Sequence, residues 1–205
     1  LIAGVKMERA DFISRLRGAK GSTVKIGVMR RGIDRILEFN IVRDDISTET
    51  VDAAYMIDEK NGYIRITSFG AKTHEEFATK LDSLQRLGMK NLIIDLEGNG
   101  GGYLNAAVDI ASELIEENKL VVYTEGRSNP RYEYMSKGKG KFLKGNLVVI
   151  VDETSASAAE ILSGAVQDWD RGLVVGRRSF GKGLVQRPFN LPDGSMIRLT
   201  IARYY

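Results

Sequence analysis

The stretch that decides the fold is KNLIIDLEGNGGG, residues 90–102, in which a short apolar run leads into a loop with four glycines. An apolar run of this length between turn residues is typical of a strand buried on both faces of a parallel sheet. Residues 103–117 then have the spacing of an amphipathic helix. Strand, glycine loop and helix in this order predict a βα unit of an α/β fold.

A second unit of the same kind begins at NLVVIVDE, residues 146–153, and continues into a helix of small residues expected over 155–169. Further strands are expected at 62–69, at 120–126 and in three segments after residue 171. The alternation of strands and helices predicts an α/β domain with a parallel-rich sheet.

Three other segments carry local predictions. A helix is expected over 73–89, where Thr73 and Glu76 have the spacing of a capping box. Residues 44–56 are interpreted as a connector. Residues 127–145 are interpreted as a basic loop that contains glycine.

The N-terminal part has a different pattern. Residues 1–46 are expected to form a helix followed by two strands, and no buried parallel strand is predicted there. We therefore place a domain boundary near residues 45–50, which divides the chain into residues 1–46 and 47–205.

The composition limits the chemistry. The 205 residues are 43% apolar and 28% charged, which indicates a globular protein with a real core. The net charge of +3 is only a weak signal for nucleic acid, so no nucleic-acid partner is expected. Absence of cysteine excludes disulfides and thiol nucleophiles, and His74 is the single histidine. No stretch approaches the roughly 20 apolar residues of a membrane span.

The segment GRRSFGKGLVQ, residues 176–186, places Lys182 between two glycines. Its spacing is similar to that of a phosphate-binding loop, but such a loop requires serine or threonine after the lysine and a helix beyond it. Here Gly183 follows, and the next residues favour a strand. The loop GNGGGY likewise lacks the last glycine of a dinucleotide fingerprint, because Tyr103 stands in its place. A surface lysine in a turn remains an alternative for Lys182.

Ser157 supports two interpretations. With Glu160 it has the S-x-x-E spacing of a capping box, which is a structural role. The neighbours of Ser157 are unusually small, however, and would leave room for a substrate backbone beside a nucleophilic serine. Because His74 lies in a charged helix far from this motif, we expect Lys182 to be the base, provided that desolvation favours its neutral form. Gln186 would then hold the lysine amine.

Five blocks in this order carry a resemblance: GYIRITSF, LIIDLEGNGGG, SASAAEILSGAVQD, GRRSFGKGLVQ and LPDGSMIRLTIARYY. Over about residues 50–205 the chain resembles the C-terminal processing peptidases, or tail-specific proteases. The resemblance implies a crotonase-like protease core, and it implies Ser157 as nucleophile, Lys182 as general base and Gln186 as the residue that positions the lysine.

The same resemblance implies the remaining site residues. Gly102 and Ala158 would donate the N–H groups of an oxyanion hole, and Asp168 matches an aspartate sometimes assigned to the site. No metal, nucleotide or other cofactor is expected. Glu97 departs from the family pattern, which usually has arginine there, and this puts in doubt any salt bridge that the arginine makes.

Residues 1–46 resemble the second half of a PDZ domain, a module that binds peptide C-termini by adding a strand to its sheet. The expected partners are therefore proteins or peptides with a free C-terminus. A periplasmic or other extracytoplasmic location is implied, with membrane association through a segment that precedes this chain. Two alternatives stay open: a catalytically inactive peptide-binding protein with a PDZ domain, and a nucleotide hydrolase with a phosphate-binding loop.

Overall fold

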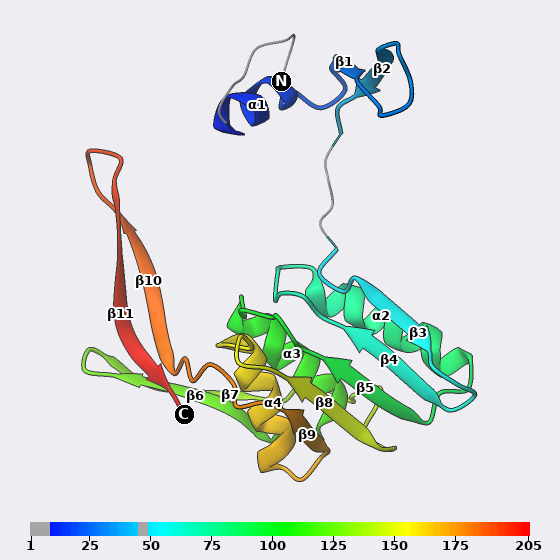
Figure 1. Cartoon of the computed structure of the whole chain (residues 1–205). Coiled ribbons are helices and arrows are strands. Elements are labelled where there is room, and N and C mark those ends of the chain that lie inside the picture. The colour runs from blue at the N-terminus through cyan, green and yellow to red at the C-terminus, as the bar shows by residue number, and fades with distance from the viewer. Residues whose placement is uncertain (1–8, 45–48) are drawn as a thin grey trace. The chain divides into compact units, whose positions relative to one another are not determined.

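The computed structural model describes residues 9–44 and 49–205 (Figure 1). The chain divides into two compact units, Leu1–Thr48 and Glu49–Tyr205. The predicted boundary between residues 46 and 47 lies outside the described residues.

The first unit contains one helix and one pair of strands. Helix α1 (Arg9–Leu16) precedes strands β1 (Thr23–Val28) and β2 (Leu37–Val42), which pair antiparallel. The guanidinium of Arg43 donates hydrogen bonds to the Leu16 carbonyl at 2.8 Å and to the Ser22 hydroxyl at 2.9 Å, and thereby joins helix and strands. The order of helix, strand and strand is as predicted.

The second unit is built on a five-stranded sheet in the order β3-β4-β5-β8-β9. The strands β4, β5, β8 and β9 run parallel in three neighbouring pairs, and β3 pairs antiparallel with β4 at one edge. The strands are β3 (Ala53–Met56), β4 (Asn61–Arg65), β5 (Asn91–Asp95), β8 (Leu147–Val151) and β9 (Leu173–Gly176). The predicted α/β fold with a parallel-rich sheet is confirmed.

Three helices cover this sheet: α2 (Thr73–Arg86), α3 (Leu104–Leu114) and α4 (Ala158–Asp168) (Figure 1). Parallel crossovers are right-handed, so crossovers that step along the sheet in one direction leave their helices on one face. Phe77, Ile94 and Leu162 are fully buried between the two layers. None of the helices in the described ranges is long and apolar enough to cross a bilayer.

A second, antiparallel sheet has the order β10-β11-β6-β7. Its strands are β6 (Leu120–Gly126), β7 (Asn129–Met135), β10 (Leu184–Asn190) and β11 (Met196–Tyr204). Strand β6 packs against α3 and α4, so this sheet borders the helical layer. Through this contact Tyr204 of β11, late in the chain, lines the same cavity as residues of α4.

Several local predictions are wrong in ways that tertiary contacts explain. The predicted connector 44–56 contains β3, which forms because it can pair with β4. The predicted loop 127–145 contains β7, a polar strand whose partner is β6. Strands β5 and β8 were predicted to be buried on both faces. In the structure one face is buried, and the residues of the other face keep part of their surface exposed.

The predicted capping box of α2 is also wrong. Lys72 occupies the N-cap position, and Thr73 is fully buried inside the first turn. The Glu76 carboxylate instead accepts hydrogen bonds from the N–H and hydroxyl of Thr50 and from the N–H of Val51. Burial raises the pKa of Glu76, but these hydrogen bonds outweigh that effect and lower it. The Glu76 carboxylate therefore anchors the segment that leads into β3.

Candidate active site

Three loops meet where β5, β8 and β9 end. These strands are neighbours and run parallel, so the loops that follow them lie at one edge of the sheet. The loops are residues 96–103, 152–157 and 177–183. The sequence predicted that the glycine loop and the serine loop would share an edge, and the structure confirms this.

Hydrogen bonds fix the first two loops to each other. The Ala156 N–H donates to the Asn99 carbonyl, and the Gly98 N–H donates to the Asp152 carboxylate, each at 3.0 Å. Asp152 also accepts hydrogen bonds from the backbone of its own loop, including the Ser155 N–H. Hydrogen bonds led by that from the Thr154 hydroxyl outweigh burial and hold the pKa of Asp152 well below its usual range.

Ser157 lies at the turn between the second loop and α4 and is 9% exposed. Its backbone has φ 56° and ψ −112°, a conformation that residues other than glycine adopt rarely and at a cost. A Cβ at Gly101 would lie 2.8 Å from the Ser157 Cβ and 2.6 Å from the Ala156 carbonyl oxygen. The glycine loop therefore packs directly against the serine, which requires glycine at position 101.

Glu160 connects the serine to the lysine loop. One carboxylate oxygen accepts the N–H groups of Ser157 at 2.8 Å and Lys182 at 2.9 Å. The other accepts the Ser179 hydroxyl at 2.8 Å and the Gly181 N–H at 2.6 Å. Burial raises the pKa of Glu160, but the four hydrogen bonds outweigh it and lower the pKa. The sequence predicted only the capping box with Ser157; the link to Lys182 depends on the fold.

A cavity of about 440 Å³ opens beside the serine. Ser157 and Lys182 both line it, and Asp168 lies at its far end. Its apolar walls come from β6 and α4 and include Val121, Val122, Ile161 and Ala165. The cavity therefore offers space for a side chain next to a serine and a lysine.

The other side chains that the sequence singled out, Asp168, Gln186 and His74, lie in three different places. Asp168 ends α4, about 16 Å along the helix from Ser157 at a rise of about 1.5 Å per residue. Gln186 is exposed on β10 opposite Thr200 and does not line this cavity. No hydrogen bond in the described part of the chain joins Gln186 or Ser157 to the Lys182 amine. His74 lies on α2 and lines a different cavity.

The two predicted oxyanion donors flank the serine. The Gly101 N–H is engaged by the Asn99 side chain at 2.8 Å. In contrast, the N–H groups of Gly102 and Ala158 have no acceptor among the described residues, and the first N–H groups of a helix lack intrahelical partners. Gly102 is exposed, so its N–H is open to a ligand, whereas Ala158 is fully buried and its N–H faces no open space in this structure.

Tyr204 is a site residue that the sequence did not reveal. Its N–H donates to the Gly183 carbonyl at 3.0 Å, which fixes β11 to the lysine loop. Burial raises the pKa of its hydroxyl, although a hydrogen bond with the Ser157 side chain acts in the opposite direction. No local motif marks this tyrosine, because only the second sheet brings it to the serine.

Residues 60–205 match the model of peptidase family S41. The chain belongs to peptidase family S41. It is 38% identical over 198 residues to the carboxyl-terminal-processing protease of Picosynechococcus sp., an alignment that covers 95% of this chain and 47% of that protein. It is 35% identical over 194 residues to the carboxy-terminal processing protease CtpA of Bacillus subtilis, covering 95% and 41%.

Solved structures agree with this family. The photosystem II D1 C-terminal processing protease is 30% identical with a TM-score of 0.66, over 92% of this chain and 52% of that one. A putative S41 protease from Bacteroides fragilis, 18% identical with a TM-score of 0.70, shares the fold over 91% of this chain and 56% of that one. The chain spans about half the length of the relatives that it matches.

The S41 chain lacks the context of a phosphate-binding loop at Lys182. Strand β10 follows the lysine, where such a loop would require a helix. Within the part of the chain that the structure describes, no group of three or more histidine, aspartate or glutamate side chains is placed to hold a metal ion.

Acid is expected to loosen the junction between the loops of this S41 core. The folded state depresses the pKa of Asp152 and Glu160 below their ordinary values of 3.8 and 4.5. Their contribution to stability is therefore complete above those values and is lost as the pH falls through the folded pKa values. We expect the urea midpoint to hold from pH 7 to about pH 5 and to fall below about pH 4.5.

The Asp152→Asn variant isolates one part of this effect. It should be less stable than wild type at pH 7, and the difference should shrink as the pH falls toward 3. A difference that stays constant across this range would contradict the assignment, because the other carboxylates titrate in both proteins.

Proposed function

We propose that this chain carries the catalytic core of a serine endopeptidase that recognises the C-terminal tail of its substrate. The observation that carries the proposal is the Glu160 carboxylate, which holds the backbone of Ser157 and of Lys182 at one oxygen. It fixes a potential nucleophile and a potential base on the same cavity.

In this proposal Ser157 is the nucleophile. The Lys182 amine, in its neutral form, accepts the hydroxyl proton as the Ser157 Oγ attacks the scissile carbonyl carbon. The protonated amine then gives that proton to the leaving nitrogen, and the C–N bond breaks. Water, deprotonated by the same amine, hydrolyses the acyl-enzyme. Gln186 would hold the lysine amine in place, once its side chain turns toward the cavity.

The oxyanion of the tetrahedral intermediate would be bound by two backbone donors. The N–H groups of Gly102 and Ala158 have no acceptor among the described residues, and preorganised donors of this kind stabilise charge that develops during attack. Burial of Ala158 and the tight packing of the glycine loop support fixed positions for these groups. Asp168 belongs to the proposal as a charged residue at the far end of the cavity.

Two observations support the proposal that the substrate's C-terminal tail is recognised: the names of the relatives and the resemblance of the first unit to a PDZ domain. Several relatives are named as carboxyl-terminal processing proteases, including the cyanobacterial and Bacillus proteins. The first unit, as half of a PDZ domain, would belong to the module that binds a free C-terminus. An extracytoplasmic location and membrane association through a preceding segment are part of the same proposal.

The test follows cleavage of an unfolded protein whose C-terminus is either free or amidated. The full-length protein should cleave the free-tailed form about tenfold or more faster, since the terminal carboxylate contributes to binding. Cleavage should persist with a chelator present. Equal rates for both forms would contradict tail recognition, and tight binding without cleavage would favour an inactive peptide-binding protein.

A further inference from the structure

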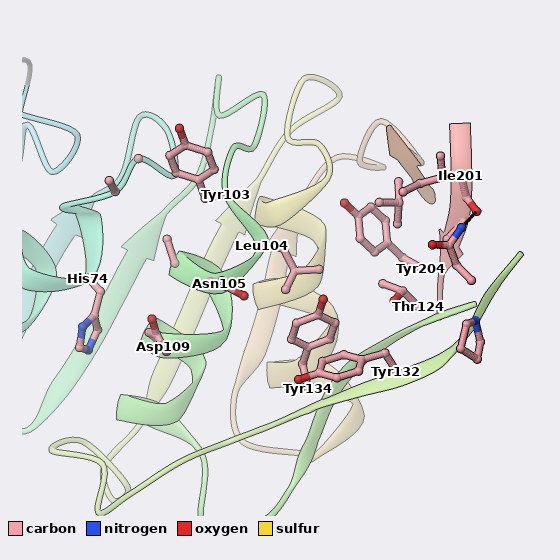
Figure 2. A pocket seen from close by; sticks show the side chains of 17 residues that line it. His74, Tyr103, Leu104, Asn105, Asp109, Thr124, Tyr132, Tyr134, Ile201 and Tyr204 are labelled. Atoms are coloured by element: carbon pink, nitrogen blue, oxygen red, sulfur yellow. Dashed lines mark hydrogen bonds between the residues drawn. The ribbon is translucent and has the colours of Figure 1, made fainter. Parts of the chain in front are cut away.

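A second and larger cavity, of about 730 Å³, also has Tyr204 in its wall (Figure 2). Tyr204 lines both cavities, so this one is the neighbour of the cavity at Ser157. We call it the tyrosine pocket, after four tyrosines that line it: Tyr103, Tyr132, Tyr134 and Tyr204. Neither the family match nor the proposed mechanism assigns a role to it.

The tyrosine pocket contains an unpaired negative charge. Asp109 projects from α3 one turn after Asn105, and both line the pocket (Figure 2). Asp109 is partly exposed, and its carboxylate has no hydrogen bond or ion pair within the described residues. No lysine or arginine is among the residues described as lining the pocket. A cationic group that enters would therefore meet a carboxylate with no competing partner.

The one histidine that lines the pocket, His74, already has a carboxylate partner. His74 Nε2 lies 2.9 Å from Glu113 Oε1, and the Glu113 side chain is only 12% exposed. A proton on His74 would be offset by that carboxylate. The net charge of the lining therefore stays with Asp109.

The aromatic walls favour the same type of ligand. Tyr132 and Tyr134 meet edge to face with ring centroids 4.8 Å apart. Tyr103 and Tyr132 are 63% and 62% exposed, so large ring surfaces remain open. Aromatic faces attract cations, most strongly where the cation is partly desolvated.

The charge pattern continues beyond the pocket. A neighbouring trough of about 490 Å³ shares Asn105, Asp109, Tyr132 and Tyr134 with it. The charged residues along this trough are Asp109, Glu117, Glu133 and Lys137. Glu133 is paired with Arg131 at 2.7 Å, and Lys137 offsets one of the two remaining carboxylates, Asp109 and Glu117, so the trough keeps an excess of one negative charge.

We propose that the tyrosine pocket binds a lysine or arginine side chain of the polypeptide substrate. The aliphatic part of that side chain would lie against the tyrosine rings, and its charge would meet Asp109. The assignment of the ligand as substrate rests on the proposed function, because Tyr204 is the wall shared with the serine cavity.

The test measures binding and does not depend on cleavage. Fluorescent unstructured peptides of about twelve residues carry one lysine at successive positions, each with a glutamine twin, and are titrated against the full-length Ser157→Ala variant. At one or two positions the lysine peptide should bind about tenfold more tightly than its twin. The preference should shrink between about 0.05 M and 0.5 M salt, since an open charge contact is screened.

Asp109→Asn in the same background should remove the lysine preference, and Asp109→Lys should reverse it toward glutamate. Glu116→Gln is the matched control, because Glu116 is exposed nearby and does not line the pocket. Equal binding of lysine and glutamine peptides, or a preference that survives Asp109→Asn, would overturn the proposal. If wild type fails to cleave but the preference depends on Asp109, the pocket assignment stands and the protease assignment fails.

Discussion

Replacing Lys182 with alanine is expected to lower kcat/KM for peptide cleavage by at least about 10³-fold, because no other base reaches the serine in the proposed mechanism. Ser157→Ala should cause a comparable loss, since each residue of a catalytic unit is required by the other. Lys182→Arg should not restore activity, because a guanidinium does not become neutral in proteins. The measurement is single-substrate kinetics by mass spectrometry with a chelator present.

Controls separate catalysis from folding. Lys139→Ala removes an exposed lysine elsewhere in the chain and should leave kcat/KM unchanged. The Lys182 and Ser157 variants should unfold near the wild-type midpoint, because the bonds to Glu160 come from the backbone. Activity that persists in both variants would mean a different site and would end the Ser/Lys assignment.

The second large effect is expected at Glu160. Glu160→Ala removes the acceptor of four hydrogen bonds, and the Ser157 and Lys182 segments would lose their common anchor. We expect kcat to fall about 10²-fold, the size of effect that a displacement of about 1 Å can produce. We expect a smaller rise in KM, because the cavity walls from β6 remain. The unfolding midpoint should also decrease, since the buried Ser157 N–H loses its acceptor.

Two variants make the Glu160 prediction specific. Glu160→Gln keeps an acceptor oxygen but loses the charge, so its activity should lie between wild type and Glu160→Ala. Glu153→Gln removes an exposed carboxylate that pairs with Arg177 in the same loops, and should change kcat by less than about twofold. Equal losses in Glu160→Ala and Glu153→Gln would show that general loosening, and not the anchor, limits the reaction.

Much of the core could be predicted from local patterns. The apolar runs at 90–97 and 146–153 predicted buried strands of a parallel sheet, and the glycine and serine loops after them were expected at one sheet edge; the structure shows that the two strands are also neighbours. These patterns are informative because a buried strand must be apolar wherever it lies in the sequence. Strand β3 was missed because it is only four residues long, and β7 because its composition is polar; both depend on pairing, with β4 and with β6.

The sequence by itself determined the α/β class, the resemblance to the processing peptidases, and Ser157 and Lys182 as candidates, because each depends on residues close together in the chain. Only the tertiary structure decided what surrounds them. Glu160 acts on the loop 22 residues later, and Tyr204 reaches the serine from the last strand. The tyrosine pocket likewise joins α2, α3 and the second sheet. Such contacts depend on how helices and sheets pack, and the periodicity of one segment carries no information about that packing.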